Sequence, residues 1–417
     1  MGLAANLRDV SDQLNARVGY RAAFGSREFR ALLTGQLISV GGTSVAAVAL
    51  TILVYRRTES PLLASLTFAL GFLPYVLGGG LLSSVVDRVR PRRLVTCSDS
   101  GAAVLAATMA WPAMPVPALL AILFAIGTLS SVSGGARAVL VRSSVSEDAY
   151  VPARSLMRIV VQFAQIGGNA GGGALLLILS PSGALLANAA SFAFSAGVVR
   201  LVLADHDNAA DIPQATLLRD SLHGARSVFG HPELRRLLLL GWLAPMFAVA
   251  PEALAAPYVA DHGGSSTLVG WWLIALPAGL IAGDVFGVRF LSAQQQRRVV
   301  APAVTASFLP YLAFAFGPPI APGLALLVAS GACGFYSLGL DARVRDAAPT
   351  ELFARTMTIN SAGLMTLQGA GFALAGTVAQ VFGPAAAIAL AGACGITFTV
   401  VLLRPDLLAR PQLESSA

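Results

Sequence analysis

The feature that most restricts the fold of this chain is a succession of apolar stretches, each close to the roughly 20 residues that a helix needs to cross a bilayer. About twelve such stretches follow one another: residues 30–54, 62–86, 94–113, 117–140, 157–179, 183–203, 237–260, 267–290, 299–317, 320–341, 357–382 and 384–403. A mean hydropathy of +0.72, with 56% hydrophobic and 12% charged residues, is unlike that of a soluble globular domain. The sequence therefore predicts an all-α membrane protein.

The basic residues lie almost entirely on one side of these predicted spans. All 28 of them are arginine, because the chain has no lysine, and only Arg56 and Arg57 fall on the far side. Arginine-rich loops on one side are the positive-inside pattern of a multi-pass membrane protein, and here the pattern predicts that both termini are cytoplasmic. The net charge of +7 is then expected to face the inner leaflet of the lipid bilayer and not nucleic acid.

The longest connection between spans divides the chain into two halves. We expect a cytoplasmic arm over 1–29, six helices over 30–203, a central loop over 204–236, six helices over 237–404 and a cytoplasmic tail over 405–417. The central loop is predicted to contain an amphipathic helix from Leu217 to Phe229.

Loop segments of the two halves resemble each other at an offset of about 200 residues. Residues 26–33 are echoed by residues 231–238, and residues 153–156 recur as residues 354–357. Chance explains any single match, but not a near-constant offset at several loops. The repeats predict a duplicated bundle, with two pseudo-symmetric six-helix halves around a central cavity.

The loop after the second span carries a charged motif. Its residues 83–93 read Ser-Ser-Val-Val-Asp-Arg-Val-Arg-Pro-Arg-Arg and resemble the Gly-x-x-x-Asp-Arg-x-Gly-Arg-Arg loop of the major facilitator superfamily. Segments 36–39, 73–74, 135–137 and 231–235 are similar to the bacterial efflux branch that includes enterobactin and macrolide exporters. Ser83 replaces the first glycine of the loop, and Asn169 replaces the proline of an antiporter element in the fifth span.

The resemblance implies a bacterial inner-membrane exporter that works by alternating access. Its expected substrate is an amphiphilic small molecule such as a drug, a siderophore or a secondary metabolite, exchanged for protons. We expect a monomer. A uniporter or importer of a small metabolite is the alternative, as is a facilitator-fold protein with an enzyme or receptor role.

Charged residues at the predicted cytoplasmic ends of the spans are candidates for gating. Asp87 can lie against the N-terminus of a neighbouring helix or a basic partner, so that breaking this contact would favour one state over another. The alternative is that these charges only set the topology. Asp99 and Asp341 are expected to cap or pair at the cytoplasmic rim. The candidate gating residues are Asp87, Arg88, Arg92, Arg137, Asp99, Asp341 and Arg355.

Acidic residues within spans are candidates for coupling or substrate contact, because each costs about 3 kcal/mol on insertion scales. Glu252 follows Pro251 in the seventh span, where Pro245 and Pro257 also predict an interrupted helix with exposed carbonyls. Asp284 in the eighth span lies shortly before Arg289, and a structural ion pair between them is the competing interpretation.

Polar and aromatic residues in the spans are the remaining cavity candidates. Gln162, Gln165 and Asn169 share one helical face, which we expect to meet protein or water. Helix packing is an equally good explanation of that stripe. Trp271 and Trp272 are predicted to be interfacial anchors. The full set of cavity candidates is Gln36, Gln162, Gln165, Asn169, Asn188, Trp242, Asn360 and Gln368.

The sequence contains no enzyme signature. A phosphate-binding loop of the P-loop type requires a lysine, which the chain lacks. The four histidines and three cysteines have neither metal-ligand spacing nor a catalytic motif. We therefore expect no enzymatic activity, no cofactor and no metal, and energy supplied by an ion gradient.

Overall fold

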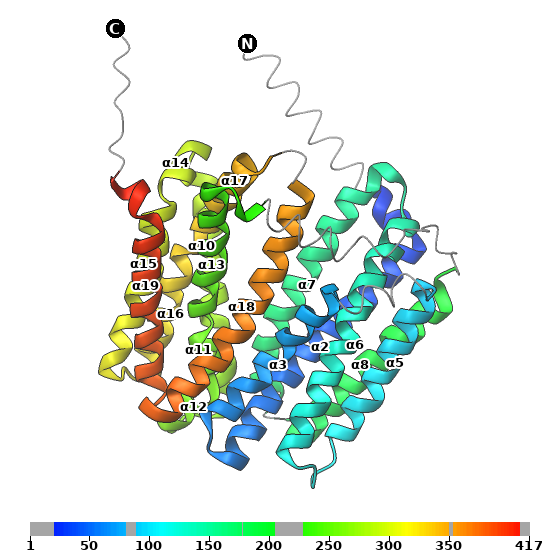
Figure 1. Cartoon of the computed structure of the whole chain (residues 1–417). Helices are drawn as coiled ribbons and strands as arrows, with labels where there is room; N and C mark the ends of the chain where they lie inside the picture. Colours follow the sequence, from blue (N-terminus) through cyan, green and yellow to red (C-terminus); the bar gives the residue numbers. More distant parts are fainter. Residues whose placement is uncertain (1–20, 81–88, 177, 205–227, 350–352, 409–417) are drawn as a thin grey trace. The chain divides into compact units, whose positions relative to one another are not determined.

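The computed structural model of this chain describes residues 21–80, 89–176, 178–204, 228–349 and 353–408 (Figure 1). Regular structure in these residues is entirely helical. The helices are α2 (Arg27–Thr58), α3 (Pro61–Gly80), α5 (Pro91–Met109), α6 (Val116–Ser144), α7 (Glu147–Leu175), α8 (Pro181–Val202), α10 (Pro232–Ala248), α11 (Ala250–Ala253), α12 (Ala255–Asp261), α13 (Ser266–Phe290), α14 (Ala293–Arg298), α15 (Val300–Leu312), η2 (Ala313–Phe316), α16 (Ile320–Ala332), η3 (Cys333–Phe335), α17 (Tyr336–Ala347), α18 (Phe353–Phe382) and α19 (Pro384–Leu408).

Proline and serine set several of the helix boundaries. Helices α3, α5, α8, α10 and α19 each begin with proline, whose fixed φ and missing N–H suit the first helical position. At α8 the Ser180 hydroxyl also accepts a hydrogen bond of 3.1 Å from the Gly183 amide. Gly383, with φ of 84°, separates α18 from α19 in a conformation that favours glycine. Short polar connections of this kind turn the chain back into the bundle.

Eight of the described helices are long and apolar enough to cross a membrane. They correspond to Arg27–Thr58, Val116–Ser144, Pro181–Val202, Pro232–Ala253, Ser266–Phe290, Ile320–Ala347, Ile359–Phe382 and Pro384–Leu403. The described parts of the other four predicted stretches include α3, α5, α7 and α15 with η2, which are shorter or less apolar. The structure therefore confirms an all-helical, multi-pass membrane protein.

The chain divides into two compact units. The first comprises Met1–Leu50 and Leu77–Ile212, and the second comprises Thr51–Val76 and Pro213–Ala417. In the first unit α5 packs against α6 and α8. Glycines bring α7 close to α2, since a Cβ at Gly168 would lie 2.7 Å from the carbonyl oxygen of Gly41.

The second unit is built around pairs of closely packed helices: α13 with α16, α15 with α19, and α10 with α18. The first of these contacts depends on glycine. A Cβ at Gly279, Gly283 or Gly331 would overlap a backbone carbonyl oxygen of the opposing helix. The small-residue face predicted for the eighth span is thus a site of direct backbone contact.

The second unit also contains the end of α2 and most of α3. The Ser60 hydroxyl donates to Gln380 Oε1 on α18 at 2.6 Å, and the Phe68 and Phe372 rings stack at 5.3 Å. Arg56 Nη2 donates to the Ser266 hydroxyl at the start of α13 at 3.0 Å. The end of α2 and the start of α3 are therefore fastened to α13 and α18.

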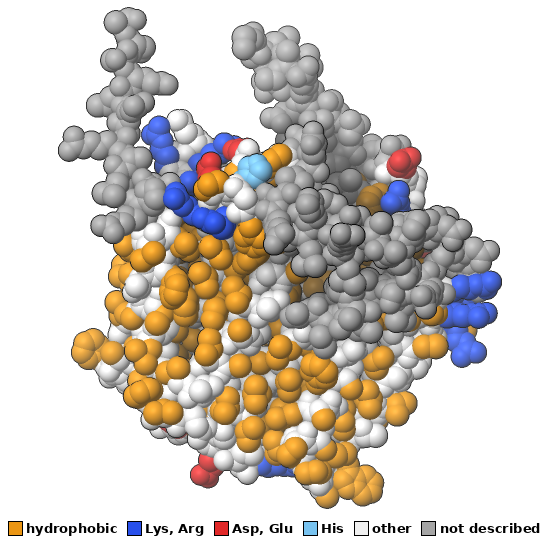
Figure 2. Space-filling view, in the orientation of Figure 1, with side chains coloured by type: hydrophobic (Ala, Val, Ile, Leu, Met, Phe, Trp, Pro, Cys, Tyr) orange, Lys and Arg blue, Asp and Glu red, His pale blue; other side chains and the backbone are white. Residues whose placement is uncertain are grey.

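Side chains of the second unit are segregated along its helices. Hydrophobic side chains cover the middle of the described surface, and basic side chains gather at the end where α14 and α17 lie (Figure 2). Exposed residues such as Val288, Phe290 and Val381 are 65% exposed or more. An apolar band with a charged border is the surface expected of helices in a bilayer.

Candidate functional site

The seventh predicted span is broken into three pieces. Helix α10 ends at Ala248, α11 covers only Ala250–Ala253, and α12 begins at Ala255. The breaks are at Val249 and Leu254, among Pro245, Pro251 and Pro257, none of which can donate a backbone hydrogen bond. The interruption predicted from the three prolines is confirmed, and it places Glu252 on a short segment between two breaks.

Two side chains from neighbouring helices hold this broken segment. The Tyr311 hydroxyl of α15 donates to the carbonyl oxygen of Ala248 at 2.9 Å. Trp272 Nε1 of α13 donates to the carbonyl oxygen of Pro251 at 2.8 Å. Within a membrane, backbone carbonyls outside a regular helix need such partners.

Trp272 therefore does not have the role predicted for it. Its side chain is 1% exposed and stacks on Tyr258 at 4.5 Å, so it is a packing and hydrogen-bonding residue and not an interfacial anchor. Its neighbour Trp271 is 59% exposed, as an interfacial anchor would be. Adjacent helical residues point about 100° apart, which explains why one of two neighbouring tryptophans is buried and the other is exposed.

The Glu252 segment borders a cavity of about 290 Å³ inside the second unit. Its walls are mostly apolar, with polar groups from six different elements: α11, α13, α15, α16, α17 and α18. Two of the predicted candidates, Glu252 and Gln368, are brought together here. The lining residues that matter most are Glu252, Gln368, Tyr336, Ser307, Ser330, Trp272, Phe308 and Leu276.

The Glu252 carboxyl has no hydrogen bond or ion pair to the residues that the structure describes, although its side chain is half-buried. An ionised carboxylate without a partner is unfavourable in apolar surroundings, whereas a protonated carboxyl is not charged. Chemically, the cavity can accept either a proton on Glu252 or a cationic group beside it. The aromatic and aliphatic walls suit an apolar body of the same ligand.

The first unit contains a buried polar cluster on three helices. Asp99 of α5 is 4% exposed and accepts hydrogen bonds from the hydroxyls of Ser133 at 3.0 Å and Ser195 at 2.7 Å. It also forms an ion pair with Arg137 of α6, which in turn contacts both serine hydroxyls. We call these four residues, Asp99, Ser133, Arg137 and Ser195, the Asp99 cluster.

The Asp99 cluster brings together two predicted gating residues, Asp99 and Arg137, and corrects the position predicted for Asp99. Asp99 pairs as expected, but it does so inside the helix bundle and not at its rim, since it lies two turns into α5. Arg137, predicted as a separate gating residue, is its partner and is 8% exposed. The ion pair and the two serine hydroxyls offset part of the cost of burying both charges, while Arg137 Nη1 is buried without a hydrogen-bond partner among the described residues.

Other predicted polar residues pair in ways that indicate packing. Asn188 is buried and accepts from the hydroxyls of Thr43 at 3.4 Å and Ser191 at 3.2 Å. Trp242 Nε1 donates to Asn360 Oδ1 at 3.0 Å and fills the space above Gly363. These side chains join α2 to α8 and α10 to α18.

The amide stripe on α7 is largely uncovered. Gln162 and Gln165 are exposed, and Asn169 is half-buried, as is Gln36 on α2. Among the residues that the structure describes, no hydrogen bond of these four side-chain amides is found. Their position is compatible with contact to water or substrate, which stays a prediction.

Asp284 does not form the ion pair proposed as its structural explanation. Its Oδ1 atom is buried without a hydrogen-bond partner in the described part of the chain, and Arg289 is exposed with its guanidinium 6.0 Å from the Phe290 ring centroid. Five residues along a helix is an offset of about 140°, so the two side chains do not share a face.

The remaining gating candidates are only partly described. Arg92 donates to the Arg200 carbonyl oxygen at 2.5 Å, joining α5 to α8, and Asp341 is exposed on α17. Asp87 and Arg88 lie outside the described residues, as does the side chain of Arg355. The predicted amphipathic helix of the central loop also lies almost wholly outside them.

Sequence reasoning missed several residues of these sites. Trp272 and Tyr336 were not expected at the cavity, and Tyr311 was not expected at the carbonyl oxygen of Ala248. Ser133 and Ser195 were not expected at Asp99. The spacing of Ser133 and Arg137, four residues apart on one helical face, was the available signal for the second group. No group of three or more His, Cys, Asp or Glu residues that can hold a metal is found in the described residues.

Comparisons with known proteins agree with this architecture. A family profile described as transmembrane secretion effector matches residues 19–416. The multidrug efflux pump Tap of Mycolicibacterium fortuitum is 25% identical over 306 residues, which cover 69% of this chain and 73% of that protein.

Solved structures show the fold alone, because their sequence identity to this chain is low. A variant of the nucleoside transporter NupG matches with a TM-score of 0.72 and 13% identity, over 91% of this chain and 99% of its own. The POT family transporter PepTSo matches with a TM-score of 0.70 and 11% identity, over 92% and 98%.

Proposed function

This chain belongs to the transmembrane secretion effector family of the major facilitator superfamily, and from that membership we propose that it exports an amphiphilic small molecule in exchange for protons. That it is a multi-pass membrane transporter follows from the family and the fold. The direction, the coupling ion and the substrate class are our proposal. The single observation that carries it is the unpartnered Glu252 carboxyl in an apolar cavity beside a broken helix.

The walls of the Glu252 cavity support an amphiphilic substrate. Trp272, Phe308 and Leu276 offer an apolar surface, while Gln368 and Tyr336 offer hydrogen bonds. A volume of about 290 Å³ holds part of a drug-sized molecule, so the rest of the substrate extends beyond this cavity. In the first unit, the exposed Gln162 and Gln165 and the half-buried Asn169 and Gln36 are proposed as further substrate-contacting residues.

The proposed proton exchange depends on the charged and the protonated state of the Glu252 carboxyl. A charged Glu252 attracts a cationic substrate, and a protonated Glu252 does not. A proton that arrives from outside therefore displaces the substrate, and loss of that proton towards the inside prepares the site again. Asp284, whose Oδ1 is buried without a hydrogen-bond partner in the described residues, is the second proposed proton carrier.

Alternating access is supported by contacts at the predicted outer end of the second unit. There α2 and α3 are fastened to α13 and α18 through Arg56, Ser60 and Phe68. We propose that these contacts break when the cavity opens outwards. At the inner ends the proposed gating residues are Asp87, Arg88, Arg92, Asp341 and Arg355, while the Asp99 cluster keeps α5, α6 and α8 together.

The proposed topology keeps the predicted boundaries. We propose twelve spans in two pseudo-symmetric halves, residues 30–203 and 237–404, joined by a central loop over 204–236. The arm over 1–29 and the tail over 405–417 are placed in the cytoplasm, and the protein is placed in a bacterial cytoplasmic membrane as a monomer.

The test is to reconstitute the purified protein in liposomes with an imposed proton gradient and to follow lumenal pH while an amphiphilic cationic drug is added. Wild type is expected to move protons when the drug is added. Glu252→Gln is expected to abolish this response, because a neutral amide cannot exchange a proton. Glu147→Gln, an exposed acid at the start of α7, is the matched control and is expected to behave as wild type.

Drug flux that continues at the same rate without a proton gradient would instead indicate a uniporter. Proton movement that is identical in Glu252→Gln and wild type would exclude Glu252 as the coupling residue. Drug binding without any flux would favour the receptor alternative.

A further inference from the structure

Two carboxyls of the second unit lie beside different levels of helix α13. Glu252 follows Pro251, whose carbonyl oxygen accepts the hydrogen bond from Trp272 Nε1. Asp284 comes twelve residues after Trp272, which is about 18 Å along the helix axis. Neither carboxyl forms an ion pair with the residues that the structure describes. The second unit therefore holds two acidic groups without a counter-charge, at a separation that α13 sets.

An apolar surface leads from one carboxyl to the other. Leu273, Pro277 and Leu280 of α13 line the Glu252 cavity. Asp284 continues this series at helical spacing, so that the four side chains project from one face of the helix. Leu280 is 38% exposed, and Asp284, one turn later, is half-buried. This face of α13 is therefore accessible beyond the cavity itself.

Close contacts fix the rotation of α13 about its axis. A Cβ at Gly279 or Gly283 would overlap a backbone carbonyl oxygen of α16, and a Cβ at Gly334 would overlap the Leu280 side chain. Adjacent helical residues point about 100° apart, so the contact of the two glycines with α16 leaves Leu280 and Asp284 to one side of it. The apolar face and its terminal carboxyl are thus preorganised for a ligand.

The surroundings of Asp284 favour a cationic group of a ligand. Its Oδ1 atom is buried and accepts no hydrogen bond from the described residues. Helices α16 and η3, which pack against α13, contain no basic residue, and Arg289 projects from a different side of α13. A protonated amine supplies both the charge and the hydrogen-bond donor that this oxygen lacks.

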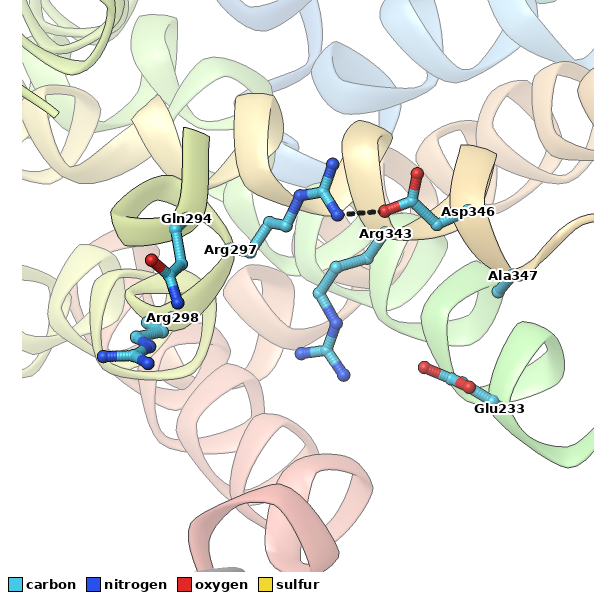
Figure 3. Close-up of a pocket in the computed structure, with 7 residues that line it drawn as sticks. All are labelled: Glu233, Gln294, Arg297, Arg298, Arg343, Asp346 and Ala347. Carbon is cyan, nitrogen blue, oxygen red and sulfur yellow. Dashed lines mark ion pairs between the residues drawn. The ribbon is translucent and has the colours of Figure 1, made fainter. Parts of the chain in front are cut away.

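A second pocket, of about 360 Å³, contains acids in different surroundings (Figure 3). It lies between the start of α10, helix α14 and the end of α17, and arginines from α14 and α17 line it together with Glu233 and Asp346. Asp346 forms an ion pair with Arg297. An ammonium group gains little beside acids that lie among arginines. Glu233 is therefore a suitable control for the two carboxyls beside α13.

We propose that the substrate of this transporter is a dication in which an apolar chain joins two amines. One ammonium group binds Glu252, the chain lies along Leu273, Pro277 and Leu280, and the second ammonium group binds Asp284. This proposal deepens the proposed function and rests on it, because the dication is the amphiphile to be exported. Asp284 is then the residue that distinguishes dications from monocations.

The test measures binding to the purified full-length protein in phosphatidylcholine nanodiscs by isothermal titration calorimetry at pH 7, with empty nanodiscs subtracted. The probes are 1,10-diaminodecane and decylamine, which has the same chain but one amine. Wild type is expected to bind the diamine about tenfold more tightly, because only the diamine meets both carboxyls. Asp284→Asn is expected to weaken diamine binding about tenfold and to leave decylamine binding unchanged.

Two controls accompany this comparison. Glu233→Gln removes an exposed acid of the second pocket and is expected to bind both probes as wild type does. Should Asp284→Asn fail to fold, wild type alone is titrated with diamines of increasing chain length. Affinity is then expected to rise steeply once the chain spans both carboxyls, whereas 1,4-diaminobutane is too short to do so.

Three results would overturn the proposal: an equal loss for the diamine and decylamine in Asp284→Asn, no loss for either, or an affinity that rises evenly with chain length. Failure of the proposed function is recognised separately in the liposome assay. Proton movement driven by a monocationic drug, without any preference for diamines, would refute the dication and leave proton exchange standing. A diamine preference that depends on Asp284, in a protein that moves no protons, would refute the exchange and leave the dication site standing.

Discussion

Asp99 in the first unit and Glu252 in the second are both carboxyls within apolar helices, but their surroundings are opposite. Asp99 accepts hydrogen bonds from Ser133, Ser195 and Arg137 and is almost fully buried. Glu252 has no such partner among the described residues and borders a cavity on an interrupted helix. A carboxyl therefore holds helices together in the first unit, whereas in the second unit a carboxyl is available to a proton or a substrate.

This difference predicts how much each carboxyl contributes to the free energy of unfolding. In the Asp99 cluster, the ion pair and the hydroxyls offset part of the desolvation of both charges and link α5, α6 and α8. At Glu252 the compensation is missing, and the unfavourable burial of a charge remains for a proton or a substrate to relieve. Four substitutions test the comparison, ordered by the expected loss of unfolding free energy.

The largest effect is expected from breaking the paired carboxyl. Asp99→Ala leaves the Arg137 guanidinium buried without its counter-ion, which destabilises a protein by about 3–5 kcal/mol. Thermal unfolding in detergent, followed by intrinsic fluorescence, should show a strongly lowered Tm. Adding Arg137→Met, which removes the stranded charge, is expected to restore most of the loss. A double variant no more stable than Asp99→Ala would contradict this account of the cluster.

A smaller loss of stability is expected from a substitution at the backbone contact between α13 and α16, which form part of the wall of the Glu252 cavity. Gly331→Ala places a Cβ against the carbonyl oxygen of Leu276 and should separate α13 from α16, at a cost of about 1–3 kcal/mol for overpacking. Gly167→Ala is the control, since a Cβ there meets nothing within 4 Å. Equal Tm values for the two variants would show that the close contact is not needed.

The third substitution removes one hydrogen bond at the broken helix. Trp272→Phe retains an aromatic ring on Tyr258 but leaves the Pro251 carbonyl oxygen without its donor, which costs about 1–2 kcal/mol. Unfolding by denaturant should report this loss, and drug-dependent proton movement should fall with it. Trp271→Phe, on the exposed neighbour, is expected to change neither quantity.

The smallest effect on stability is expected at the unpaired carboxyl itself. Glu252→Gln breaks no described hydrogen bond or ion pair, so its free energy of unfolding should differ from wild type by less than about 1 kcal/mol. Transport-coupled proton movement should nevertheless disappear. A Tm lowered as far as that of Asp99→Ala would mean that Glu252 has a structural partner, and the comparison would fail.

The sequence was sufficient to predict features that depend only on consecutive residues. Apolar length predicted the helices, and Pro245, Pro251 and Pro257 predicted the broken segment that carries Glu252. Both follow from rules about consecutive residues, since a proline removes its own amide donor wherever the chain goes.

The pairings between helices could not be read from the sequence. Asp99 and Arg137 are 38 residues apart, and only the packing of α5 on α6 shows that they meet. Asp284 and Arg289 are close in sequence, yet their side chains diverge around the helix. Trp271 and Trp272 are adjacent, and which of them points inward depends on how α13 is rotated against its neighbours.

The separation of Asp99 from Arg137 has a consequence for how the protein is made. When α5 leaves the ribosome it carries an acid whose counter-ion has not yet been synthesised, and its own apolar length is modest. Lateral release of α5 into lipid is therefore expected to wait for α6, so that the two helices leave the translocon as a hairpin with the charge pair already formed. Ser195 on α8 then joins a pair that is already in place, so that α5, α6 and α8 are expected to assemble around the Asp99 cluster.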